Sequence, residues 1–445
     1  IQVITAELFN QQGATTLAEA LRNSPGVGTF YVGENGNTTT GDAVYMRGFD
    51  TSGSIFVDGI RDLGSISRDV FNIEQIEVAK GPAGTDNGRT APSGAINLAT
   101  KQAFQRDYGA ASVSLGTDNQ RRATADFNHD FDNGSALRIN LMAQDSDVPG
   151  RDEVNNKRWG IAPALAFGLG TATRVHFNLL HVEQDNVPDG GVPTIGLPGY
   201  SSPDPARPQI GAAPRVDSGS FYGTTSDHDD VTADMFTMRV EHDFSDRARL
   251  QNTTRWGRSK QEYMLTAFMA SQDPARFSTP DLDDPATWEL ARSLPTFKDQ
   301  DNEILANHTN LRVEWGSGEV RHELSTGVEF SREKLDARVL AALDGTTWPA
   351  ANLYDPDPHV TGLAWGTTGA DSHGRTDTVA AYAFDYKDLG KQAGYQAAAI
   401  LSGTPIKDIP VEYAQNLQLS INEKAAASMG VTIPADLAEE AQTKF

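Results

Sequence analysis

From about residue 108 onward, hydrophobic and polar residues alternate along the chain with a period of two. In one such run, Leu137, Ile139 and Leu141 are separated by Arg138 and Asn140. Similar runs occupy residues 174–179, 236–244, 310–315 and 324–330. Because alternate side chains of a strand point to opposite faces, each run predicts a β-strand with one apolar face. We predict about ten such strands up to Phe384, most of them near the roughly 9–11 residues that span a bilayer.

The connectors between the predicted strands differ in length. Residues 132–134 and 245–246 predict tight turns, whereas residues 185–231, 267–301 and 338–375 are long and rich in Pro, Gly and Asp. Alternation of short and long connectors is typical of an outer-membrane barrel, with short turns on the periplasmic side and long loops outside. A soluble β-sandwich or a solenoid with half-buried strands is the alternative that this pattern leaves open.

The first hundred residues predict a small compact unit. Residues 15–21 predict a short helix with a Thr N-cap, ended by Pro25 and Gly26. Short strands are predicted at residues 44–47, 54–57, 73–78 and 94–100. Short strands combined with many glycines indicate a small α/β or mainly-β domain.

After about residue 386 the pattern changes to helices alternating with one strand. It predicts a helix over 388–402 that ends at Gly403, a strand over 417–421, a helix over 422–429 and a final helix after Pro434. The sequence therefore predicts a mainly-β protein in three units. These units are residues 1–103, residues 104–385, whose pattern favours a partial, antiparallel membrane barrel over the sandwich or solenoid, and an α/β appendage over 386–445.

Composition narrows the possible functions. Lys and Arg number 37 against 60 Asp and Glu, and the resulting net charge of −23 argues against general binding to nucleic acids. The chain has no cysteine, which excludes disulfides, cysteine-ligated metal sites and thiol nucleophiles. No run of about 18 apolar residues predicts a membrane-spanning helix. Because Ile1 begins inside a strand-like run, we expect that any targeting signal was removed or never included.

Short motifs follow one another in the first hundred residues. They are TLAEAL at 16–21, PGV at 25–27, MRGF at 46–49, FVDGIR at 56–61, IEVAKGP at 76–82, GR at 88–89 and GAINL at 94–98. Their order and spacing resemble the plug domain of TonB-dependent outer-membrane receptors. Residues 33–51 and 65–69 are similar, more specifically, to the catecholate siderophore receptors of that family.

The resemblance extends from Ile1 to about Asp385 and implies a plug that fills a barrel of about 22 strands. It implies uptake of ferric catecholate siderophores across the outer membrane of a Gram-negative bacterium. The iron is then carried in the ligand, and no cofactor is expected. The resemblance also implies two partners, outer-membrane lipid and the TonB–ExbB–ExbD complex. In the family, that complex pulls on a TonB box that lies before the position of Ile1.

The last sixty residues carry a different resemblance. DLGKQAGY at 388–395, IPVE at 409–412, NEKAA at 422–426 and MGVTIP at 429–434 resemble the C-terminal end of an ABC-transporter substrate-binding protein. The seam falls at about residues 384–388, so we expect a chimera or an assembly error. A periplasmic small-molecule binding component and a non-functional gene fusion are the rival interpretations.

The strand count also predicts the state of the sheet. About ten strands are too few to encircle a plug of about a hundred residues, because barrel diameter grows with strand number. We therefore expect an open, curved sheet beside the plug. We expect residues 386–445 to pack as a small helical appendage or to be left loose, and to add no strand to this sheet.

The resemblance implies that Glu34, Arg61, Ser65 and Arg68 lie in plug segments that face outward and contact the ligand. A ferric tris-catecholate is a bulky trianion with aromatic faces, and Arg offers it charge, forked donors and stacking. Ser65 would add a neutral donor, while Glu34 would orient Arg68 or cap a loop. An ordinary solvated turn with scattered charges is the alternative for these positions.

A second set of plug residues is implied to hold the plug against the barrel through ion pairs. These residues are Arg47, Glu74, Glu77, Lys80 and Arg89.

No further chemistry is predicted. The acidic cluster at residues 227–230 and Asp234 lacks the glycine-turn spacing of a Ca²⁺ loop, so we predict no metal site there. His176, His181 and His242 occur singly and are expected to line the lumen or an interface. Phosphate-loop, HExxH and GxSxG motifs are absent, so the sequence does not indicate an enzyme.

Overall fold

The computed structural model describes most of the chain up to Ala383 and two short segments beyond it. The described residues are 1–30, 41–62, 64, 66–81, 93–269, 273–292, 295–317, 320–343, 345–369, 371–383, 418–421 and 443–444. The predicted tail helices lie outside the described residues, as do Glu34, Ser65 and Arg89.

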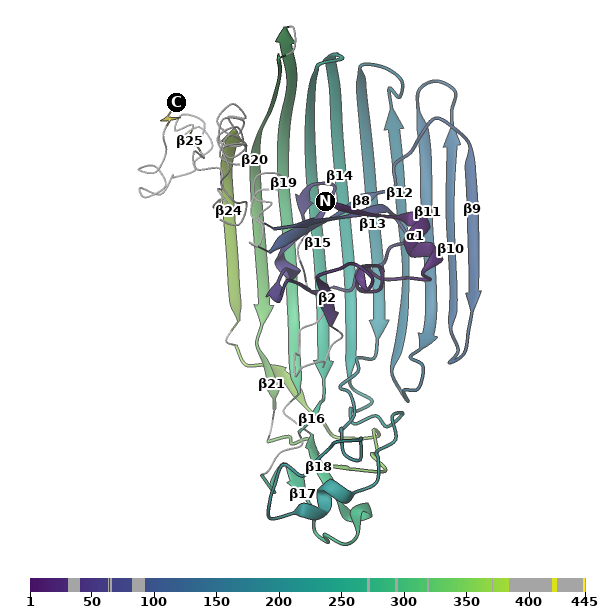
Figure 1. Cartoon of the computed structure of the whole chain (residues 1–445), viewed down its shortest axis with the longest axis vertical. Coiled ribbons are helices and arrows are strands. Elements are labelled where there is room, and N and C mark those ends of the chain that lie inside the picture. Colours follow the sequence, from purple (N-terminus) through teal and green to yellow (C-terminus); the bar gives the residue numbers. More distant parts are fainter. Residues whose placement is uncertain are drawn as a thin grey trace, which may run out of the picture.

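Ten long strands form one antiparallel sheet, which we call the wall (Figure 1). They are β9 (Tyr108–Leu115), β10 (Arg121–Asp130), β11 (Ala136–Asp147), β12 (Asn155–Phe167), β13 (Thr173–Asn186), β14 (His228–Ser245), β15 (Ala248–Leu265), β19 (Thr296–Ser317), β20 (Val320–Arg338) and β24 (Ser372–Ala383). Each pairs with the next long strand in the sequence, so the wall is a meander. The predicted number of strands and their antiparallel order are confirmed.

The two faces of the wall have opposite polarity. On β11, the side chains of Arg138 and Asn140 point to one face and are buried, at 6% and 1% exposure. Leu141 points to the other face and is 39% exposed. The outward rows of the neighbouring strands also expose large apolar side chains, including Trp159 and Trp256. A soluble sandwich buries its apolar rows, whereas a membrane barrel turns them outward. The structure thus has the polarity of a membrane barrel and excludes the sandwich.

The outward apolar rows have the height of a membrane core. On β19 the outward row runs from Leu305 to Trp315, both 50% exposed, and includes two polar residues, Asn307 and Thr309. Ten residues rise about 33 Å along a strand, which a tilt of about 40° reduces to roughly 25 Å across the membrane. Beyond Leu305 the outward positions become charged, as at Glu303 and Asp301. The loop-side ends of the long strands therefore extend past the apolar band.

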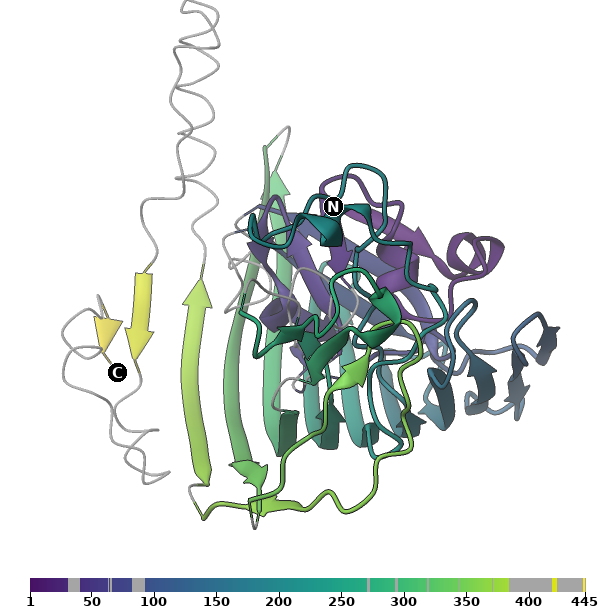
Figure 2. The same ribbon diagram turned by 90° about the horizontal axis from the view of Figure 1, so that it is seen from below.

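The N-terminal unit, the plug, lies on the polar face of the wall (Figures 1 and 2). Its main sheet has the order β1-β7-β8-β5-β6, and a smaller sheet has the order β2-β3-β4. The strands are β1 (Gln2–Thr5), β2 (Val27–Phe30), β3 (Ala43–Met46), β4 (Phe49–Asp50), β5 (Ile55–Val57), β6 (Ile60–Arg61), β7 (Ile73–Lys80) and β8 (Gly94–Thr100). The helices are α1 (Ala6–Gln11), α2 (Leu17–Leu21) and the 3₁₀ turn η2 (Ser52–Ser54).

Helix α2 anchors the plug core. Thr16 accepts from the Glu19 amide and the Glu19 side chain accepts from the Thr16 amide, so a capping box fixes the start of the helix. Leu17 and Leu21 are fully buried against Ile76 and Val78 of β7 in one cluster. Burying each such side chain contributes about 1.5–3 kcal/mol. Among the described residues no helix has the length and apolarity needed to span a membrane.

Strand β3 ends one residue earlier than the pattern predicts. Arg47 has φ of 52° and Gly48 has φ of 84°, so both lie in the left-handed region. An extended strand cannot continue through such residues, and the chain turns back into β4.

The three long connections fold together into a unit that we call the loop cap, at the lower end of Figure 1. It comprises residues 187–227 and the described parts of 266–295 and 339–371. Its short elements are η3 (Pro208–Ala212), β16 (Phe268–Met269), β17 (Phe277–Ser278), η4 (Pro285–Thr287), β18 (Glu289–Arg292), β21 (Leu340–Ala342), β22 (Ala351–Asn352) and β23 (Trp365–Thr367). Trp288, Tyr222 and Leu353, one from each connection, share an apolar core. The sequence predicted these connections as loops but not their common core.

The tail adds two short strands to the sheet, so the expectation that it adds none is wrong. Strand β25 (Gln418–Ile421) pairs with β24 through Tyr382↔Leu419 and Ala383↔Gln418, and β26 (Thr443–Lys444) pairs with β25. The edge of β24 presents unpaired backbone groups, and the strand predicted at 417–421 satisfies some of them. The sheet nevertheless stays open within the described residues, with β9 and β26 at its ends.

Candidate plug–wall site

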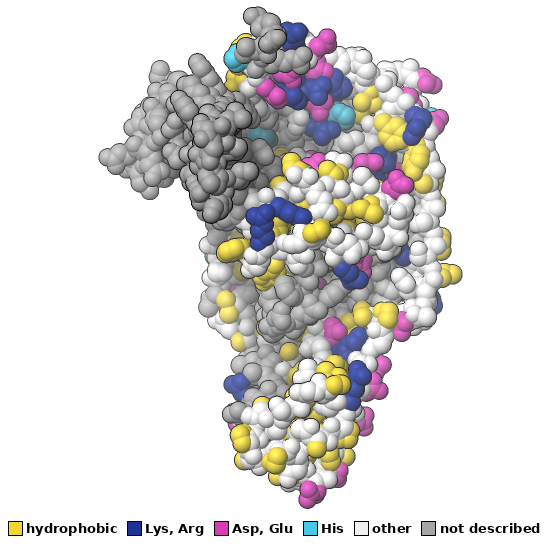
Figure 3. All heavy atoms as spheres, viewed as in Figure 1, with side chains coloured by type: hydrophobic (Ala, Val, Ile, Leu, Met, Phe, Trp, Pro, Cys, Tyr) yellow, Lys and Arg dark blue, Asp and Glu magenta, His cyan; other side chains and the backbone are white. Residues whose placement is uncertain are grey.

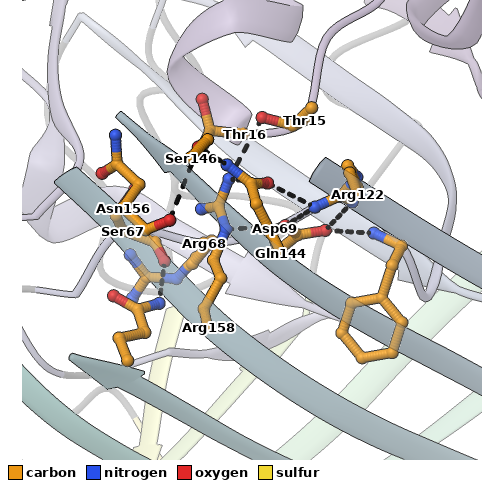
Figure 4. A network of polar contacts seen from close by, with 12 residues as sticks. Thr15, Thr16, Ser67, Arg68, Asp69, Arg122, Gln144, Ser146, Asn156 and Arg158 are labelled. Atoms are coloured by element: carbon orange, nitrogen blue, oxygen red, sulfur yellow. Dashed lines mark hydrogen bonds and ion pairs between the residues drawn. The ribbon is translucent and has the colours of Figure 1, made fainter. Parts of the chain in front are cut away.

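An enclosed polar contact between the plug and the wall centres on Asp69 (Figure 4). Its carboxylate is 1% exposed and accepts two hydrogen bonds of 2.8 Å from the guanidinium of Arg122 on β10. Arg158 on β12 places its Nε 3.2 Å from the same carboxylate. One plug carboxylate is therefore shared by two wall arginines that are themselves 9% and 5% exposed.

Local backbone contacts hold Asp69 in this position. The Val70 amide donates to the Thr15 carbonyl, and Asp69 forms a bridge with Thr16 at the start of α2. Arg158 also donates to the Thr15 hydroxyl at 3.1 Å. The capped end of α2 and the segment around Asp69 are thus fastened to the wall together (Figure 4).

Two more wall arginines reach the plug. Arg138 on β11 forms a two-bond contact with Asp126 of the wall and a 3.3 Å contact with Glu74 of β7. Arg255 on β15 donates to the Val57 carbonyl at 2.6 Å and lies 3.4 Å from Asp58. Breaking a buried pair by removing one partner typically costs 3–5 kcal/mol, because a buried charge loses its partner. Arg255 and Asp58 are 1% and 9% exposed, whereas Glu74 is 55% exposed, so the Arg255 contact contributes more to the registration of the plug on the wall.

The second set of predicted residues is only partly brought to the wall. Glu74 meets Arg138, but Glu77 bonds Gln75 and Asn97 within the plug. Lys80 donates to Gln2, also within the plug. The Arg47 side chain is exposed. Most of the charge that fastens the plug is thus supplied as arginine from the wall and carboxylate from the plug.

Arg68 is enclosed inside the plug, in contrast to the outward-facing position expected for it. Its side chain is 8% exposed and contacts Asp62 at 2.6 Å and Asp42 at 3.0 Å. Burial alone would lower the pKa of Arg68, but attraction to Asp62 and Asp42 raises it, so the guanidinium stays charged. Arg68 is a clasp between two carboxylates rather than a free cation.

Arg61 contacts the wall. Its Nε donates to the Gly53 carbonyl at 3.0 Å, and its Nη1 lies 3.5 Å from Glu333 of β20. The side chain is 31% exposed, so it is the more accessible of the two described candidate ligand residues.

A cavity lies between the plug and the wall beside the Arg68 clasp. About 80 Å³ is accessible to the centres of water molecules, and Asp62, Arg68 and Arg255 line it. Two of its lining atoms, Ser259 Oγ and Gln184 Oε1, are buried without a hydrogen-bond partner in the described structure. Ordered water satisfies such groups where a cavity has room for it. The seam between plug and wall is therefore expected to be hydrated.

The predicted acidic cluster is bound by protein donors. Asp227 is 3% exposed and accepts from the Thr224 hydroxyl and the Thr266 amide, while Asp229 accepts from Gln261. Burial raises the pKa of Asp227, and these hydrogen bonds oppose the change. Asp227 is thus not solvated as a charge run usually is. Within the described residues no group of three or more His, Asp or Glu side chains is arranged to hold a metal ion.

We therefore predict that residues 185–231 bind no structural metal. Titrating the chain with Ca²⁺ in a calorimeter should give no saturable heat. The same titration of an Asp229→Asn variant should be indistinguishable from it. A stoichiometric signal of micromolar or tighter affinity in the parent chain would overturn this prediction.

Sequence reasoning missed the wall arginines that meet the plug. Arg122, Arg138, Arg158 and Arg255 all occupy the polar face of a strand whose other face is apolar. A basic residue on the inner face of a predicted membrane strand is the signal that would have found them. It does not identify the partner, because the paired plug residues lie far away in the sequence.

Comparison with known proteins identifies relatives of both the plug and the wall. Residues 1–95 match the family model described as TonB-dependent Receptor Plug Domain, and residues 369–444 match that of ABC transporter substrate binding protein. The catecholate siderophore receptor Fiu of Escherichia coli K12 is 50% identical over 383 residues, which are 86% of this chain and 50% of Fiu. The probable TonB-dependent siderophore receptor PiuA of Acinetobacter baumannii is 32% identical over 76% of this chain and 43% of PiuA. The chain spans about half the length of these relatives.

Solved structures of Fiu and PiuA have the same fold as this chain over most of its length. The closed form of Fiu superimposes with a TM-score of 0.80 at 49% identity, covering 86% of this chain and 53% of that structure. PiuA superimposes with a TM-score of 0.72 at 26% identity, over 86% of this chain and 61% of that structure. These relatives are siderophore receptors, and not enzymes. The chain is thus similar over 86% of its length to a catecholate siderophore receptor, and its first 95 residues match the plug domain of TonB-dependent receptors.

Proposed function

We propose that this chain is the plug and part of the barrel of a receptor that takes up ferric catecholate siderophores. The observation that carries the proposal is the match to Fiu, a catecholate siderophore receptor, across both plug and wall. The iron is cargo in the ligand, and the protein contributes no cofactor to its transport. The TonB–ExbB–ExbD complex would supply energy by pulling on the plug, and outer-membrane lipid would surround the apolar band.

We further propose domain limits of 1–103 for the plug, 104–385 for the partial barrel and 386–445 for the appended segment. The family match at residues 369–444 supports a separate origin for the last segment. It also supports a second candidate function, a fragment of a periplasmic small-molecule binding component of an ABC transporter. The requirement for detergent separates the two, because an apolar band needs an apolar phase and a periplasmic protein does not. A chain that stays monomeric in buffer without detergent would favour the second candidate.

The proposed ligand contacts are Glu34, Arg61, Ser65 and Arg68. The contacts of Arg68 limit how it could bind a ligand, because its guanidinium already has two carboxylate partners. A trianionic ligand would have to replace Asp62 or Asp42 as the partner of Arg68. Ligand binding at Arg68 therefore requires the clasp to open, which would free the segment that carries Asp62.

In the complete receptor, Arg68→Ala is expected to weaken ferric catecholate binding more than Arg138→Ala does. Losing one hydrogen bond to a charged group costs about 1.5–3 kcal/mol, which is about 10- to 150-fold in affinity. Arg138 is a matched control, since it is similarly buried and also contacts two carboxylates, Asp126 and Glu74. Affinity is to be measured by fluorescence quenching with the ferric catecholate. Equal affinities for the parent and both variants would remove Arg68 from the site.

A further inference from the structure

The loop cap has an interior of its own. Trp288, Phe277 and Leu290 from the second connection pack with Ile210 and Tyr222 from the first, and all five are nearly inaccessible to solvent. The visible surface of the cap carries hydrophobic and charged side chains side by side, without one large apolar patch (Figure 3). The cap thus has the inside–outside division of a folded unit rather than of separate loops.

Arg292, at the end of β18, joins the three connections. Its guanidinium is 7% exposed and donates to the Tyr222 and Gly223 carbonyls of the first connection, at 2.9 and 3.3 Å. It also donates to the Pro349 and Asp357 carbonyls of the third connection. All four acceptors are backbone carbonyls, which cannot move without moving their chain segments.

The geometry of arginine suits this role. A guanidinium holds five N–H donors in a fixed planar fork, so it can bond acceptors on several sides at once. A lysine ammonium keeps the charge but concentrates its three donors on one nitrogen. Other contacts cross the same boundaries, since the Tyr222 hydroxyl donates to the Leu353 carbonyl and the Thr225 amide to the Pro358 carbonyl.

We propose that the three long connections open and close as a single cooperative unit, with Arg292 as the residue that joins them. A molecule that approaches the lumen from the loop side would then meet one barrier rather than three independent loops. This inference concerns the folding of the cap and does not depend on which ligand the receptor takes.

Hydrogen exchange of the full chain in detergent micelles tests the proposal. The reporters are one hydrogen-bonded amide from each connection, those of Tyr200, Ala291 and Leu353. In an Arg292→Lys variant, all three should exchange at least about tenfold faster, and by a common factor, because one opening exposes them together. Tyr222→Phe should give a smaller common increase that includes Ala291 of the second connection, although the Tyr222 hydroxyl donates to the Leu353 carbonyl of the third connection.

Arg174→Lys is the matched control. Arg174 pairs with Glu241 and Asp243 at the opposite end of the wall, so the three reporter amides should keep their parental rates. The proposal fails if Arg292→Lys accelerates exchange only within residues 266–295, or if Tyr222→Phe leaves Ala291 unchanged while it accelerates Leu353.

Discussion

Replacing Asp69 by alanine is expected to reduce the free energy that holds the plug on the wall by about 3–5 kcal/mol. The substitution leaves the guanidinium groups of Arg122 and Arg158 buried without their shared carboxylate. It also removes the acceptor of the Phe71 amide, which bonds Asp69 at 2.9 Å. The measurement is the urea dependence of tryptic cleavage within the plug, carried out on the full chain in detergent.

Glu74→Ala provides the comparison for this experiment. Glu74 also links the plug to a wall arginine, but its side chain is 55% exposed and its single contact is 3.3 Å long. Exposed pairs typically contribute 0–1 kcal/mol, so this variant should resemble the parent. Adding Arg122→Met to Asp69→Ala should recover part of the loss, because one uncompensated charge is removed. Equal sensitivity of the Asp69 and Glu74 variants would contradict the role given to Asp69.

The 445-residue chain by itself is expected neither to insert stably into a bilayer nor to transport ferric catecholate. Every residue of β9 is exposed, and β9 pairs only with β10 among the described strands. On β24, which has 12 residues, only Tyr382 and Ala383 pair with β25. Each unpaired backbone group in hydrocarbon costs several kcal/mol, so the two edges together cost on the order of tens of kcal/mol.

Extraction of reconstituted liposomes with alkaline carbonate measures this. The chain should appear in the soluble or aggregated fraction, whereas complete Fiu reconstituted in parallel should stay with the lipid. Planar-bilayer recordings should show no stable conductance steps. Carbonate-resistant insertion together with uptake of ferric catecholate would show that the edges are paired in the membrane in some other way.

The sequence was sufficient for those features that repeat or that depend on neighbouring residues. The period-two runs located the strands of the wall, because the polarity of each side chain indicates which face of the strand it occupies. The capping box at Thr16 and Glu19 is likewise local, and it correctly placed α2. Local sequence did not predict every short-range feature. The predicted strand included Arg47, but the left-handed backbone of Arg47 ends β3 at Met46.

The polar partners could not be predicted in the same way. Arg158 and Asp69, or Arg255 and Val57, are brought together only after both the plug and the wall have formed. Arg68 illustrates the same limit, since no local pattern indicated that Asp42 and Asp62 would lie on either side of it. The pairing of β25 with β24 depended on an unsatisfied strand edge, which no local pattern records.

The meander order of the wall has a kinetic consequence. Neighbouring strands such as β14 and β15 are joined by a turn of two residues, so each hairpin closes a short loop and forms early. The side-chain contacts described above that seat the plug join residues 53 to 272 positions apart, from Asp69 with Arg122 to Arg61 with Glu333. We therefore expect a folding chain to assemble its hairpins first and to seat the plug last. A slow final phase in refolding would then report the docking of two preformed parts.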